Sequence, residues 1–122
     1  MRYTGVTAEW ATAVARGVHR RGVDLPPPTI DEVWVGCDLA LYVRYRVGTR
    51  PVAARFRLDV DPTFGDPPSD ADLLASDIFH RLRADPGPDA FVDDEGYRWW
   101  SNDPPAAGWS ATLPRLRILT IS

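Results

Sequence analysis

The chain has 122 residues, a net charge of −3, and apolar and charged fractions of 44% and 25%, which are ordinary values for a single globular domain. Its apolar runs are too short to span a membrane, its first residues lack the hydrophobic segment of a secretory signal, and its single cysteine excludes an internal disulfide. The sequence therefore predicts one domain over residues 1–122, located in the cytoplasm, with no membrane partner.

The 14 basic side chains are all arginine, and lysine is absent. Together with frequent Ala, Pro, Gly and Asp, this usage indicates a GC-rich bacterial genome and does not by itself indicate a function. The negative net charge argues against nucleic acid as the main partner.

A first helix is predicted from Thr7 to about Gly22. Thr7 is a suitable N-cap, and Glu9 lies in the first turn, where the helix dipole favours a negative charge. Apolar residues recur at helical spacing along one face: Trp10, Ala11, Val14, Ala15 and Val18. Because glycine often ends a helix, we expect this one to stop at Gly22.

The most regular pattern is an alternation typical of half-buried strands. Every odd position of the first run is apolar: Val33, Val35, Cys37, Leu39, Leu41, Val43, Tyr45 and Val47. After a break at residues 48–51, the apolar residues fall on even positions: Val52, Ala54, Phe56, Leu58 and Val60. Two such runs across a short Gly-containing break predict one long β-hairpin of two strands.

The turn fixes the expected register of this hairpin. If Gly48 and Thr49 form a two-residue type II′ turn, Leu41 faces Phe56 and each apolar residue meets an apolar partner. A four-residue loop keeps the same parity and remains an alternative. Pro51 has no N–H to offer a further strand, so the start of the second strand is expected to be an edge.

A second helix is predicted after Ser69, which we take as its N-cap, with Asp70 and Asp72 in the first turn. Its apolar face has helical spacing: Ala71, Leu74, Ala75, Ile78, Phe79 and Leu82. The sequence Asp-Pro-Gly-Pro at residues 85–88 ends it.

The last third of the chain predicts shorter strands. Phe91–Val92 and residues 97–100 flank a turn at residues 93–96, which suggests a second hairpin. Residues 116–121 predict a paired terminal strand. The element order α-β-β-α-β-β-β predicts a two-layer α+β fold, with an antiparallel sheet built on the long hairpin and both helices on one face.

The candidate partner-binding site is the acidic turn and the two tryptophans beside it: Asp93, Asp94, Glu95, Trp99 and Trp100. Adjacent residues on a strand point to opposite faces, so one tryptophan is expected in the core and the other is available as an anchor. The bland interpretation is that helix or loop residues cover both rings.

The alternative binding face is the outer face of the long hairpin, which carries Tyr42, Arg44, Arg46, Arg55 and Arg57. Guanidinium groups interleaved with an aromatic ring are suited to phosphates and stacked bases. The simpler interpretation is a solvated outer face, or one paired with the acids that follow it in the chain.

No cofactor, metal or catalytic residue is predicted. Asp59 and Asp61 end a strand, Asp70 and Asp72 suit a helix start, and the chain has no calcium-loop spacing. Three further reactive side chains, Cys37, His19 and His80, have no partner at metal-ligand spacing, and Cys37 falls on the buried parity of its strand.

These observations favour a small non-enzymatic bacterial protein-binding domain. Its most concrete form is an immunity or inhibitor protein that covers a basic toxin or enzyme, and a homodimer stays open. One alternative is a small enzyme or ligand-binding domain with a pocket between sheet and helices. The other is a nucleic-acid binder that uses the arginine face.

Overall fold

The computed structural model describes residues 7–36, 39–58, 70–84, 91–101 and 117–121. The elements follow in the order α1 (Ala8–Asp24), β1 (Thr29–Gly36), β2 (Leu41–Val47), β3 (Arg50–Phe56), α2 (Ala71–Arg83), β4 (Phe91–Val92), β5 (Arg98–Ser101) and β6 (Arg117–Ile121). The strands form one six-stranded sheet in the order β4-β5-β3-β2-β1-β6. The α+β class is confirmed. The sheet is mixed because β3 and β5 are parallel, while the other pairs are antiparallel.

Helix α1 begins as predicted and ends later than predicted. The Thr7 hydroxyl accepts a hydrogen bond from the Trp10 N–H at 3.1 Å, which caps the first turn. The helix continues past Gly22 to Asp24. A Cβ at Gly22 would lie 2.2 Å from Cγ1 of Ile30, so the glycine permits close packing against β1 instead of ending the helix.

Helix α2 is capped one residue later than predicted. The Asp70 carboxylate accepts hydrogen bonds from the N–H groups of Asp72 and Leu73, at 2.8 and 3.4 Å, so Asp70 is the N-cap. Ser69 lies outside the described residues. Serine and aspartate cap helices about equally well, so composition alone does not distinguish two neighbouring candidates.

The first alternating run is two strands, where the sequence predicted one. The chain reverses between Gly36, whose N–H donates to the Ala40 carbonyl at 3.1 Å, and β2, with Leu39 at a φ of 61°. Val33 therefore faces Val43, and Val35 faces Leu41. Three residues separate Gly36 from Ala40. Because this number is odd, odd positions of β1 near the turn face odd positions of β2, and the alternation of apolar residues continues unchanged through the turn.

The β2–β3 hairpin has the predicted register. Leu41 faces Phe56, Tyr45 faces Val52, and Gly48 opens the turn with a φ of +64°. The parallel ladder with β5 begins at Val52, immediately after Pro51. The second hairpin, β4–β5, and the pairing of the terminal strand β6 with β1 are confirmed as well.

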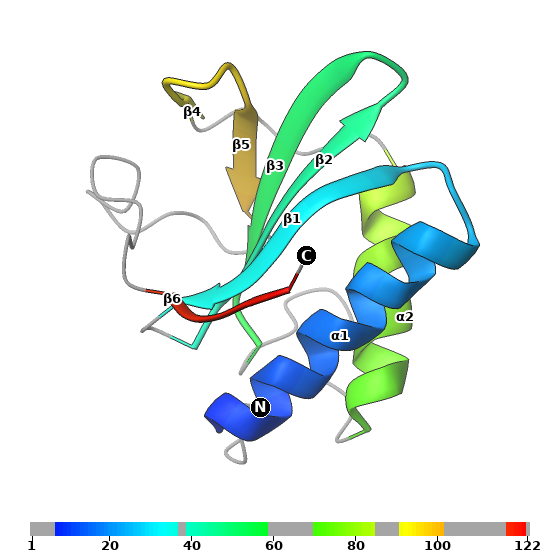
Figure 1. Ribbon diagram of the computed structural model, residues 1–122, viewed down its shortest axis with the longest axis vertical. Helices are drawn as coiled ribbons and strands as arrows, with labels where there is room; N and C mark the ends of the chain where they lie inside the picture. Colours follow the sequence, from blue (N-terminus) through cyan, green and yellow to red (C-terminus); the bar gives the residue numbers. More distant parts are fainter. Residues whose placement is uncertain (1–6, 37–38, 59–69, 85–90, 102–116, 122) are drawn as a thin grey trace.

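Both helices lie on one face of the sheet, which we call the inner face (Figure 1). Apolar residues of α1, α2 and the strands form the inner core there, and the helices meet where Gly17 of α1 packs against Ala75 of α2. A second buried cluster lies on the opposite, outer face: Trp34, Ala40, Tyr42, Ala53 and Trp99. The sheet thus buries apolar side chains on both faces. This differs from the solvated outer face that was one interpretation of the sequence.

Neither described helix is long and apolar enough to cross a membrane.

Candidate functional site

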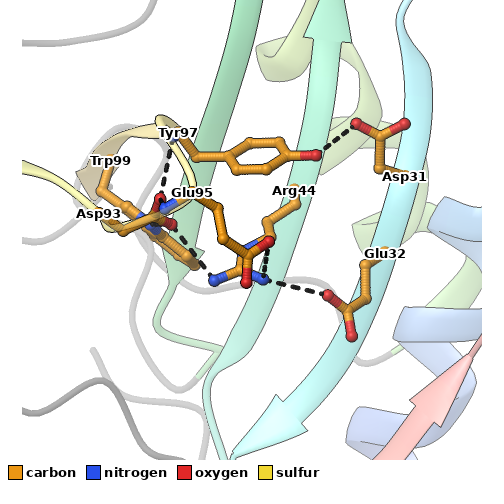
Figure 2. Close-up of polar contacts among 7 residues, drawn as sticks. All are labelled: Asp31, Glu32, Arg44, Asp93, Glu95, Tyr97 and Trp99. Carbon is orange, nitrogen blue, oxygen red and sulfur yellow. Dashed lines mark hydrogen bonds and ion pairs between the residues drawn. The ribbon is translucent and has the colours of Figure 1, made fainter.

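A polar cluster joins three segments on the outer face (Figure 2). It contains residues from β1, β2 and the β4–β5 hairpin: Asp31, Glu32, Arg44, Asp93, Glu95, Tyr97 and Trp99. We refer to these residues as the Arg44 cluster. It includes three of the five predicted partner-binding residues, Asp93, Glu95 and Trp99, of which the two acids form ion pairs with Arg44.

Asp93 organises the acidic turn from within. One carboxylate oxygen, Oδ1, accepts hydrogen bonds from the N–H groups of Glu95 and Tyr97, at 2.9 and 3.0 Å. The Asp93 carbonyl accepts the N–H of Gly96, which has a φ of +90°. Aspartate commonly closes turns in this way, and glycine tolerates the left-handed backbone that follows.

The second oxygen of Asp93 ties the turn to the sheet. Oδ2 accepts hydrogen bonds from the indole Nε1 of Trp99 at 2.7 Å and from Nη2 of Arg44 at 3.2 Å. The side chain is only 7% exposed. Burial raises the pKa of Asp93, but the hydrogen bonds from Trp99 and Tyr97 and the charge of Arg44 outweigh it and hold the pKa below its ordinary value.

Arg44 is surrounded by carboxylates and aromatic rings. Its Nη1 lies 3.3 Å from Glu95 and 3.5 Å from Glu32. Its guanidinium carbon lies over three rings, 5.4 Å from the centroid of Trp34, 5.3 Å from Tyr97 and 6.0 Å from Trp99. Since the side chain is 13% exposed, these charge and cation–π contacts are weakly screened.

A β-bulge in β1 supplies two adjacent acids to this face. The register with β2 shifts between Ile30 and Glu32, so Asp31 is the extra residue. Asp31 pairs with Nε of Arg46 at 3.0 Å and accepts a hydrogen bond from the Tyr97 hydroxyl at 2.9 Å. Burial, then the hydrogen bond and charge of Asp31, raises the pKa of Tyr97.

The two tryptophans lie on opposite faces, as the alternation predicted, and both are buried. Trp99 is 0% exposed in the outer cluster of rings, and Trp100 is 5% exposed in the inner core. The expected exposed tryptophan anchor is therefore not present. Asp94 and Glu95 are exposed, and Val92 beside them is 56% exposed.

Two arginines of the arginine face are ion-paired, and a third donates a hydrogen bond to a tyrosine. Arg44 and Arg46 are paired with carboxylates, and Nε of Arg55 donates to the Tyr42 hydroxyl at 3.3 Å. Tyr42 is 1% exposed and stacks on Trp34 at 5.4 Å. Arg57 also interacts with another group, so it is not free to bind a ligand without losing that interaction. The acids that neutralise this face, Asp31 and Glu32 among them, were missed because β1 was not recognised as a separate strand.

The remaining candidates have structural roles or lie outside the described residues. Asp70 caps α2, and Asp72 is paired with Arg21 and Arg20; the hydrogen bond and charge of Arg21 are the main reason that the pKa of Asp72 is lowered. Asp59, Asp61 and Cys37 are outside the described residues. His19 and His80 lie on the two helices. The described part of the chain contains no group of three or more His, Cys, Asp or Glu suited to a metal ion.

A cavity of about 350 Å³ lies where the end of β2 meets the end of α2. Its lining is mainly apolar, with one guanidinium: Pro27, Pro28, Val47, Leu82 and Arg83. No local sequence pattern indicates this cavity, because its walls come from three separate segments.

Comparison of the chain with protein-family models, with curated proteins and with solved structures finds no match in any of the three.

Proposed function

We propose that this protein is a small non-enzymatic binding domain that covers a basic protein partner with the acidic surface around the β4–β5 turn. In its most concrete form it is a bacterial immunity or inhibitor protein for a basic toxin or enzyme. The observation that supports this proposal is the set of carboxylates gathered around Arg44 and Arg46. Four carboxylates, those of Asp31, Glu32, Asp93 and Glu95, share two guanidiniums.

The arrangement of these groups suits recognition. The internal hydrogen bonds of Asp93 and its contact with Arg44 hold the turn in one conformation, so little entropy is lost when it binds. Glu95, 65% exposed, and the exposed Asp94 stand at the tip of this turn. Exposed carboxylates in a fixed position attract a basic surface and speed its association.

The apolar contact comes from a different residue than the sequence suggested. Trp99 and Trp100 are buried and serve to support the turn. Val92, 56% exposed on β4, is the apolar residue that directly precedes Asp93 in the chain. We propose that contact of the Val92 side chain with the partner slows dissociation of the complex.

Nucleic-acid binding is the weaker proposal for this face. A phosphate would have to displace carboxylates that already neutralise Arg44 and Arg46. The exposed carboxylates of Asp94 and Glu95 would repel the nucleic-acid backbone.

Binding kinetics on a partner recovered from the native host would test the proposal. The variant Asp94→Asn/Glu95→Gln is expected to associate more slowly, with a weaker salt dependence of the on-rate, and Val92→Ala is expected to dissociate faster. The matched control is Asp24→Asn/Asp77→Asn, which removes the same charge from exposed positions on the helices. If the turn variants bind like the control, the acidic surface is not the interface.

A further inference from the structure

We propose that the cavity between β2 and the end of α2 binds a small carboxylic acid with a hydrocarbon body. Its volume of about 350 Å³ falls within the roughly 300–1,000 Å³ of small-molecule sites. Five residues of the described part of the chain line it, and four of them are apolar: Pro27, Pro28, Val47 and Leu82. The fifth, Arg83, brings a positive charge to an otherwise apolar wall.

The guanidinium of Arg83 is held in place by groups that do not neutralise it. Its Nε donates to the carbonyl of Pro27 at 3.0 Å, and its Nη2 donates to the carbonyl of Leu25 at 2.7 Å. Its carbon lies 4.9 Å from the ring centroid of Phe79. A guanidinium that is oriented before binding loses less conformational entropy when a carboxylate arrives.

Arg83 keeps donors for a ligand. A guanidinium has about five N–H groups, and the two carbonyls occupy only Nε and Nη2. Within the described residues, no carboxylate pairs with Arg83 and its Nη1 makes no hydrogen bond. The partial negative charge at the end of α2 stabilises the cation without using these donors.

A second guanidinium lies on the same face of the hairpin as the lining residue Val47. Arg50 is the cross-strand partner of Val47, so the two side chains lie on the same face of the hairpin. Arg50 is exposed, and among the described residues it forms no ion pair. An apolar cavity with Arg83 in its wall, and with Arg50 across from the lining residue Val47, is complementary to a molecule with a hydrocarbon body and an anionic head. This site is independent of the acidic surface, which has the opposite charge.

Hexanoate and its uncharged isostere hexanamide are suitable probes. We expect hexanoate to shift the methyl resonances of Val47 and Leu82 in a saturable NMR titration. Hexanamide should bind about tenfold more weakly, because it lacks the charge that the guanidiniums recognise. Equal affinity for the two probes, or shifts confined to residues away from the cavity, would overturn the proposal.

Two matched pairs of variants locate the site. Arg50→Gln should weaken hexanoate binding severalfold, whereas Arg16→Gln, the same change at an exposed position on α1, should not. Val47→Trp should block the cavity, whereas Val92→Trp, at another exposed strand valine, should leave binding intact. Equal effects within either pair, in variants with wild-type melting curves, would show that hexanoate does not bind in this cavity.

Discussion

The indole Nε1 of Trp100 donates a hydrogen bond to the hydroxyl of Tyr45 across 2.9 Å inside the inner core. The two residues belong to β5 and β2, which are separated in the sheet by β3, so the bond bridges over a whole strand. Phe56 of β3 also meets Trp100 edge to face, with ring centroids 5.3 Å apart. The hydrogen bond to Tyr45 satisfies the only polar atom of the Trp100 side chain, which is 5% exposed.

Replacing Tyr45 with phenylalanine should therefore destabilise the fold by about 1–3 kcal/mol, because the buried indole N–H loses its acceptor. Urea denaturation followed by tryptophan fluorescence measures the change. Tyr97→Phe is the matched control, since it removes a partly exposed hydrogen bond to Asp31. A loss at Tyr45 no larger than that at Tyr97 would contradict the role of the buried bond.

Alkaline pH should act on the same residue. Burial raises the pKa of Tyr45 to about 12, against a partial opposing effect of the hydrogen bond from Trp100. The unfolded chain, with an ordinary tyrosine pKa of 10.0, loses this proton first. The free energy of unfolding should be unaffected below pH 10 and fall by about 2–3 kcal/mol as the pH rises toward 12. The free energy of unfolding of Tyr45→Phe should not show this decrease between pH 10 and 12. If the free energy falls in parallel for Tyr45→Phe and the unmodified protein, Tyr45 is not the cause.

The close contact between the helices predicts that Gly17→Ala is destabilising. Alanine is normally the better helix residue by about 1 kcal/mol, but its Cβ at this position would lie 2.6 Å from Cβ of Ala75. Forced separation of packed helices costs about 1–3 kcal/mol. The double variant Gly17→Ala/Ala75→Gly should recover part of the loss in thermal or urea denaturation. A stabilised single variant would mean that the helices are not this close.

Two arginines of β2 separate the effect of burial from that of charge. Arg44 and Arg46 both pair with carboxylates, but their side chains are 13% and 49% exposed. Arg44→Gln should cost about 3 kcal/mol, because Asp93 is left buried without its cation. Arg46→Gln should cost less than about 1 kcal/mol, as expected of a surface pair. Similar losses in chemical denaturation would be inconsistent with a buried Arg44 cluster.

Acidic pH should expose the contribution of Asp93. Because its pKa is lowered in the folded protein, the stability that its carboxylate provides is present above the ordinary pKa of 3.8 and is lost as the pH falls through the lower folded value. The difference in unfolding free energy between the protein and Asp93→Asn should therefore shrink below pH 3.8. A difference that stays constant down to the acid transition would show that Asp93 carries no such linkage.

Much of the local structure follows from short-range chemistry. Alternation placed Leu41 opposite Phe56 and put Trp99 and Trp100 on opposite faces, because side-chain direction has a period of two in any strand. Thr7 was identifiable as a cap because the contact that it makes lies within one turn. These features depend on neighbours in sequence.

The parts that were missed depend on neighbours in space. The turn between β1 and β2 preserves the apolar parity, so the pattern gave the face of each residue and left the number of strands undetermined. The partners of Arg44 are Glu32 of β1 and the two acids Asp93 and Glu95 of the β4–β5 turn. The cavity beside Arg83 likewise needs three segments to be brought together. No short sequence window contains such information.

Because Asp31 is the extra residue of the bulge, it can change without changing the residues of the inner face. Ile30 faces Tyr45 and Glu32 faces Arg44 on either side of it, so removal of Asp31 would leave a regular ladder with every inner residue in its place. A single-codon deletion would thus take a carboxylate from Arg46 and an acceptor from Tyr97 without repacking the inner core. In evolutionary terms, insertions and deletions at this one position are a route by which the charge of the outer face changes while the hydrophobic residues beneath the helices stay the same.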